Sequence, residues 1–149
     1  MEPLEILKDN KTLFIGIGNV LKSDDGVGVY ISNNIKTRKN TSSLTVEVSI
    51  ENYIGKINKL NSDLLVLLDC MDFQQPPGYW DLIPVSGLTG HTTNTHNISL
   101  EKISEFFNAQ AYILGIQPRY ITFGEHLSAE VKMAANSIIE QINRLNQKI

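Results

Sequence analysis

Residues 12–35 decide the fold, and they read TLFIGIGNVLKSDDGVGVYISNNI. Within the segment from Thr12 to Gly16, the three residues Leu13, Phe14 and Ile15 form a continuous apolar run, which is typical of a strand buried on both faces. A loop containing Gly and Asp follows. After it, Val27, Ile31 and Ile35 recur at the i, i+4, i+8 spacing of an amphipathic helix over about 26–37. A strand, a loop and a helix in this order predict the first unit of an α/β sheet.

The same alternation of apolar runs and amphipathic segments continues along the chain. It predicts strands over 44–50, 63–70, 79–85 and 111–116. It predicts helices over 53–60 and 98–109, and a terminal helix that begins at an N-capping Ser128. The strands 63–70 and 79–85 are separated by a Pro-Pro-Gly turn that is too short for a helical crossover. We therefore expect these two strands to be antiparallel or splayed.

No repeat, low-complexity tract or linker divides the 149 residues. We therefore predict a single domain over 1–149 of the α/β class. Its expected architecture is a three-layer sandwich, in which a five-stranded, mixed but mainly parallel sheet has helices on both faces. The long C-terminal helix should cover one face with an apolar stripe that includes Val131, Ala135, Ile138 and Ile142.

Composition narrows the possible partners and the compartment. The net charge of -3 argues against nucleic acid, because phosphate binding needs a concentrated positive field. No apolar stretch approaches the ~20 residues of a membrane helix, and residues 1–11 lack the apolar region of a signal peptide. The single Cys70 cannot form an internal disulfide, which indicates a reducing compartment. We expect a cytoplasmic protein, with a monomer favoured although the sequence leaves the oligomeric state open.

Three loops carry candidate functional side chains. In an open α/β sheet, ligands bind where loops leave the carboxyl ends of the strands. Residues 18–26 follow the first strand, residues 69–72 end the third, and residues 90–97 follow the fourth. Together they offer carboxylates and imidazoles, a mixed donor set that suits zinc, nickel or manganese.

Each candidate also has a structural interpretation. Asp24 and Asp25 precede a helix, where carboxylates cap free N–H groups. Asp69 ends a buried strand, where a carboxylate is costly unless it is paired or bound to a metal. His91 and His96 lie in a polar loop, where a histidine is usually just solvated. Cys70 has no basic neighbour in sequence, so we interpret it as a small core residue.

A nucleotide-binding enzyme is also a possibility, because Gly16 and Gly18 lie at the end of the first predicted strand. The dinucleotide fingerprint needs another glycine at position 21, which is Leu21, and the chain has no GK[ST] phosphate loop. Two aspartates at a helix N-terminus also repel phosphate. The sequence chemistry therefore argues against this class.

Four segments, in order, resemble the hydrogenase maturation proteases. They are GIGNVLKSDDGVGV at 16–29, LLVLLDCMD at 64–72, THNISL at 95–100 and ILGIQP at 113–118. The last two look most like the branch that serves formate-hydrogenlyase-type hydrogenases. The chain departs from the family pattern at 50–53, where relatives commonly carry a Gly-rich stretch.

The resemblance implies an activity and a set of site residues. Such proteases are endopeptidases that remove a C-terminal tail from the large-subunit precursor of nickel–iron hydrogenases. It implies an acidic ligand in the first loop, an Asp at the end of the third strand and a His ahead of a helix, which map onto Asp25, Asp69 and His96. Asp25 is preferred over Asp24, and His91 has no counterpart. The metal is nickel carried by the precursor, so no tightly bound resident cofactor is expected.

The attacking group and the reaction itself leave alternatives open. No Ser-His-Asp or Cys-His pair is evident, so we expect an attacking water activated by the metal or by a carboxylate, with Asp24 and Asp72 as candidate bases. A second hypothesis uses the same site differently: a non-catalytic checkpoint chaperone that senses nickel in the precursor without cutting it.

Overall fold

The computed structural model describes residues 3–88 and 99–145. Its strands are β1 (Thr12–Ile17), β2 (Thr41–Glu47), β3 (Leu64–Cys70), β4 (Trp80–Pro84) and β5 (Gln110–Ile116). Its α-helices are α1 (Val27–Ser32), α2 (Ile54–Lys59), α3 (Leu100–Ser104) and α4 (Ala129–Arg144). Short 3-10 helices are η1 (Pro3–Leu7), η2 (Ser23–Gly26), η3 (Ile50–Tyr53) and η4 (Val85–Gly87).

The strands form one sheet in the order β2-β1-β3-β5-β4. β1 is parallel to β2 and β3, β3 is parallel to β5, and only β4 pairs in the antiparallel sense, with β5. This confirms the predicted five-stranded, mainly parallel sheet. The strand β4 does run opposite to β3, as the short connection predicts, but β5 lies between them, so the two strands do not pair.

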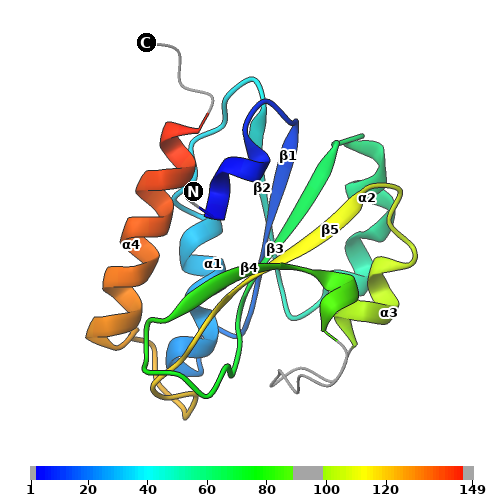
Figure 1. The fold of residues 1–149 in the computed structure, drawn as a ribbon. Coiled ribbons are helices and arrows are strands. Elements are labelled where there is room, and N and C mark those ends of the chain that lie inside the picture. The colour runs from blue at the N-terminus through cyan, green and yellow to red at the C-terminus, as the bar shows by residue number, and fades with distance from the viewer. Residues whose placement is uncertain (1–2, 89–98, 146–149) are drawn as a thin grey trace.

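Helices cover both faces of the sheet and bury two apolar clusters (Figure 1). On one face α1, α4 and η1 pack against alternate strand residues, and the cluster includes Phe14, Val66 and Ile138. On the other face α2, α3 and the turns beside them enclose a cluster that includes Ile15, Leu67 and Ile57. Because successive strand side chains point to opposite faces, the continuous apolar runs of β1 and β3 supply both clusters.

The backbone of α1 lies directly against the sheet at Gly28. A Cβ atom on Gly28 would lie 2.0 Å from the carbonyl oxygen of Leu68 and 2.5 Å from that of Ile17. Both obstacles are backbone atoms, so only glycine permits this approach of the helix to β1 and β3. The close contact brings the residues just before α1 near the carboxyl end of β3.

Several element boundaries differ from the sequence prediction. The strand β2 begins at Thr41 rather than Leu44, because its polar first residues pair with β1 at the start of the sheet, where Thr12 faces Thr41. It ends at Glu47, whose φ of 55° turns the chain out of the sheet. The helix α1 ends at Ser32, and Asn34 then donates to the carbonyl of Tyr30. The helix α3 spans Leu100–Ser104 and is shorter than the predicted helix over 98–109, whose first residue lies outside the described part of the chain.

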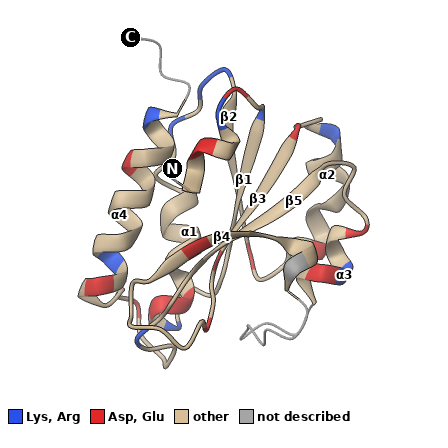
Figure 2. Cartoon of the chain, in the orientation of Figure 1, with Lys and Arg blue, Asp and Glu red and all other residues tan. Residues whose placement is uncertain are grey.

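The terminal helix agrees with its prediction. Ser128 occupies the N-cap position of α4, although its hydroxyl donates to Asp24 and makes no capping hydrogen bond, and the buried residues of the helix are Val131, Ala135, Ile138 and Ile142. In the ranges 3–88 and 99–145, no helix is both long and apolar enough to cross a membrane. Lys and Arg are spread over several loops and helices instead of collecting on one element (Figure 2).

Candidate functional site

The first loop places Asp25 in η2, directly ahead of α1, with a side chain that is only 1% exposed. Its Oδ2 accepts a hydrogen bond from the backbone N–H of Asn19 at 2.9 Å. Gly18 makes this loop possible, because it has a φ of 140° and a Cβ there would lie 2.0 Å from the carbonyl oxygen of Asp25. The glycine therefore allows the loop to fold back and hold Asp25 beside β1.

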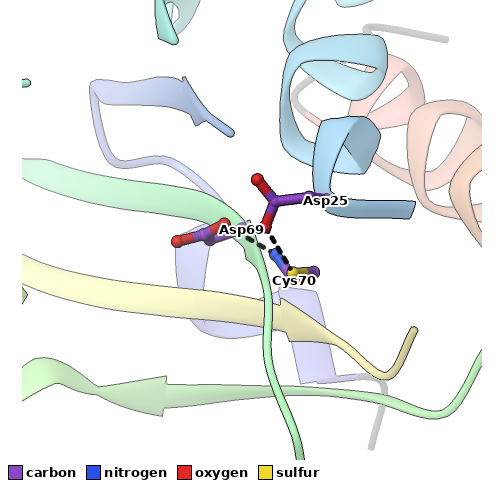
Figure 3. A group of neighbouring side chains, drawn as sticks. All are labelled: Asp25, Asp69 and Cys70. Carbon is purple, nitrogen blue, oxygen red and sulfur yellow. Dashed lines mark hydrogen bonds between the residues drawn. The ribbon is translucent and has the colours of Figure 1, made fainter. Parts of the chain in front are cut away.

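The third strand places Asp69 next to its carboxyl end, where it is 1% exposed. Its Oδ1 accepts from the backbone N–H of Cys70 at 2.8 Å. Figure 3 shows Asp25 approaching this strand end from the start of α1. Potential ligand atoms of Asp25, Asp69 and Cys70 all lie within 4.8 Å of one another. The structure thus brings together the two aspartates that the sequence placed in a common site.

The sequence did not predict that Cys70 would join this group. Its side chain is 3% exposed and lies in the core cluster on the α1 face, as the core interpretation requires. In addition, its Sγ lies 3.1 Å from Asp25 Oδ1 and donates to that oxygen (Figure 3). The available signal was strand alternation, which turns Cys70 to the opposite face from Asp69 and toward the helix that follows Asp25.

Asp24 has a different environment from Asp25. It is completely buried and accepts hydrogen bonds from the backbone N–H groups of Arg119, Tyr120 and Ser128 and from the Ser128 hydroxyl, at 2.7–3.1 Å. These bonds fasten the β5–α4 connection to the first loop. The helix-capping alternative is wrong for both aspartates, since neither η2 nor α1 has a side-chain cap.

Asp72, the other candidate base, is exposed and follows the strand end by two residues. Its Oδ1 accepts from the backbone N–H of Gln74 at 2.9 Å and from the Gln117 side-chain amide at 3.2 Å. Gln117 also accepts from the backbone N–H of Phe73 at 2.6 Å. These contacts fix the chain just beyond β3 and leave the carboxylate of Asp72 reachable from solvent.

His91 and His96 lie outside the described residues, so the predicted imidazole ligand stays a prediction. One part of the reasoning for it is wrong. The prediction places the 90–97 loop at the carboxyl edge because the loop follows a strand, but β4 is antiparallel, and Pro84 at its carboxyl end faces Tyr112 near the beginning of β5. The strand-edge rule therefore does not place this loop beside Asp69.

Two buried carboxylates this close together create a strongly negative site. Removing a carboxylate from water is costly, and two like charges in a medium of low dielectric repel each other. A divalent cation offsets both costs, and carboxylate oxygens are ligands for nickel, zinc and manganese. The chemistry of the donor set therefore fits a divalent metal.

The same negative charge acts on the neighbouring thiol. Burial, together with the charges of Asp69 and Asp25, raises the pKa of Cys70 well above its ordinary value. Above about pH 8.5 an unfolded chain releases this proton while the folded chain keeps it, so the unfolded state binds fewer protons. We expect the free energy of unfolding to fall with rising pH in this range, by up to about 1.4 kcal/mol per pH unit.

Urea unfolding of the wild type and of Cys70→Ala between pH 8 and 9.5 measures this effect. The variant lacks the thiol and should show a flatter dependence on pH. Parallel curves for the two proteins would contradict a raised pKa for Cys70.

Comparison with known proteins finds similarity over nearly the whole chain. No known family model matches. A protein of Methanocaldococcus jannaschii, named provisionally as a hydrogenase maturation protease, is 26% identical over an alignment of 161 positions, which covers 98% of this chain and 95% of the relative.

Solved structures share the fold. The crystal structure of the [NiFe] hydrogenase maturation protease HycI from Thermococcus kodakarensis has a TM-score of 0.82, 24% identity and coverage of 95% of this chain and 96% of its own. The solution structure of the endopeptidase HycI from Escherichia coli has a TM-score of 0.78 and 22% identity, and covers 93% of this chain and 92% of its own. HybD from Escherichia coli, a hydrogenase maturating endopeptidase, gives 0.72 and 19%, with 89% of each chain covered. Sequence and fold both support the resemblance to hydrogenase maturation proteases.

Proposed function

We propose that this chain is a hydrogenase maturation endopeptidase, which removes the C-terminal tail of a nickel–iron hydrogenase large-subunit precursor after nickel insertion. The observation that carries the proposal is the meeting of Asp25 and Asp69 at one end of β3, with potential ligand atoms within 4.8 Å. They come from segments far apart in sequence and form the acidic part of the ligand set that the resemblance implies. The whole-length relative and the shared fold add support.

Nickel in this proposal belongs to the precursor, and Asp25, Asp69 and His96 read it. Asp69 and Leu67 lie on the same face of β3, and Leu67 shares its core cluster with Leu100, four residues after His96. We propose that His96 completes the set, since the four residues from His96 to Leu100 span up to about 14 Å. Both aspartates are 1% exposed, so side chains at this edge must move before a metal on another protein can reach them.

Binding the nickel would position the scissile peptide beside the site. A water then attacks the peptide carbonyl carbon, the C–N bond breaks, and the amine of the released tail takes up a proton. Of the two candidate bases, Asp72 is exposed, whereas Asp24 is buried and accepts four hydrogen bonds. These contacts favour Asp72 if a carboxylate activates the water, and metal activation of the water is the alternative.

The proposal extends to the branch that serves formate-hydrogenlyase-type hydrogenases. It rests on the resemblance at 95–100 and 113–118. The HycI structures from Thermococcus kodakarensis and Escherichia coli and the HybD structure from Escherichia coli all share the fold, so the fold alone does not separate the branches. Cleavage of precursors from both branches, measured side by side, tests the assignment.

The decisive experiment compares nickel-loaded and metal-free precursor. The purified protein should shorten only the nickel-loaded precursor, with a mass loss equal to that of the tail, because only the loaded precursor offers the carboxylates a metal ion to bind. Mass spectrometry of both reactions measures this. Equal cleavage of the two precursors would refute nickel reading, and an intact tail in a stable complex would identify the checkpoint chaperone instead.

A further inference from the structure

Cys70 occupies the point where the apolar core meets the two aspartates. In β3, Val66, Leu68 and Cys70 alternate onto the α1 face and belong to one core cluster. Cys70, at the carboxyl end of this row, donates a hydrogen bond to Asp25, with its Sγ 3.1 Å from Oδ1. A side chain that packs like an apolar residue therefore also makes a polar contact with a proposed metal ligand.

The contact completes a pair of restraints on Asp25. The Asn19 N–H holds Oδ2 at 2.9 Å, and the Cys70 thiol holds Oδ1. These donors come from two different segments, the first loop and β3. A carboxylate held at both oxygens cannot turn about its Cβ–Cγ bond without losing a hydrogen bond, so its plane is fixed before any metal arrives.

We infer that Cys70 is a positioning residue for the proposed metal-reading site, whose thiol holds Asp25 in the orientation that faces Asp69. The inference rests on the proposed function and deepens it. In this role the sulfur donates a hydrogen bond and does not bind the metal. A sulfur ligand must give up its proton and with it this hydrogen bond, so the two roles exclude each other and differ spectroscopically.

The test uses three variants of the full chain. Cys70→Ala removes the donor, and Cys70→Ser restores a hydroxyl donor at the same position. Val66→Ala is the matched control, because it truncates a buried residue on the same strand and face, about 13 Å from Cys70. All assays are run at a temperature where every variant is fully folded.

Kinetics with nickel-loaded precursor separate positioning from packing. We expect Cys70→Ala to raise KM about fivefold with kcat within twofold of the wild type, because nickel recognition weakens while the chemistry does not. Cys70→Ser and Val66→Ala should both stay within twofold in KM. Equal KM values for Cys70→Ala and the wild type would overturn the inference, as would a failure of Cys70→Ser to recover.

Two readouts do not depend on cleavage, so they separate this inference from the proposed function. The amide NMR signal of Asn19 reports on the Asp25 carboxylate, and it should move in Cys70→Ala and hold its position in Cys70→Ser and Val66→Ala. An unmoved signal in Cys70→Ala would overturn the inference even if cleavage fails for every variant. Titration with Co(II) should give no sulfur-to-metal charge-transfer band, and such a band would identify Cys70 as a ligand instead.

Discussion

Replacing Asp25 or Asp69 with asparagine is expected to lower tail removal from nickel-loaded precursor by at least about a hundredfold. Asparagine keeps the size of the side chain and removes the negative charge that a divalent cation needs from its oxygen ligands. Both side chains are buried members of one group, so among the described residues no carboxylate on the protein surface can take the place of either one. Initial rates of tail release, followed by mass spectrometry, measure the effect.

Asp81→Asn is the matched control for this loss. Asp81 and Asp69 both stand in register with Gly115, and each accepts a hydrogen bond at 2.8 Å from the backbone N–H of the next residue. Asp81 lies two strands from Asp69, about 10 Å away, so its variant should cleave at the wild-type rate.

The histidine ligand is tested in the same assay. His96→Ala should fail to cleave the precursor. His126→Ala, which changes an exposed histidine on the β5–α4 connection, should cleave it at the wild-type rate. Unimpaired processing in any two of Asp25→Asn, Asp69→Asn and His96→Ala would defeat the assignment of the site.

Gly28→Ala is expected to lower the free energy of unfolding by about 3–5 kcal/mol. The added methyl would lie 2.0 Å from the carbonyl oxygen of Leu68, so α1 must move away from the sheet. That shift also separates Asp25, ahead of α1, from Asp69 in β3, and cleavage should fall with stability. Urea unfolding followed by circular dichroism measures the change.

Gly55→Ala provides the comparison. Gly55 lies in α2, and no atom stands within 4 Å of a Cβ placed there. Alanine favours a helix over glycine, so this variant should be stabilised by about 0.5–1 kcal/mol. A loss in Gly55→Ala similar to that in Gly28→Ala would show that the clash with the sheet is not the cause.

The sequence was most informative where one physical constraint dominates. The apolar runs of β1 and β3 must be buried on both faces, which predicts central strands of a parallel sheet and helices on each side. The start of β2 was missed because Thr41–Ser43 are polar residues at a sheet edge, and their strand conformation comes from pairing with β1. Sequence periodicity does not carry that information.

The candidate site was predicted in part for a similar reason. Asp25 follows β1 and Asp69 lies next to the carboxyl end of β3, and because both are central parallel strands, topology alone brings the two residues to one edge. The contact of Cys70 with Asp25 depends on how closely α1 packs against β3, which is set by the missing side chain of Gly28. The rule that located the first two residues could not locate the 90–97 loop, because the direction of β4 is decided by its pairing with β5.

Asp24 and Asp25 are consecutive residues with contacts to different elements, one to the β5–α4 connection and one to the end of β3. An inserted or deleted residue in the first loop would displace Asp24 and Asp25 together. Moving the chain by one residue could then restore the contact of one aspartate but not the contacts of both. The length of the segment between Gly18 and Gly26 is therefore fixed more tightly than the identity of its exposed members, such as Val20 and Leu21. Engineered diversity in this segment should change side chains and preserve residue count.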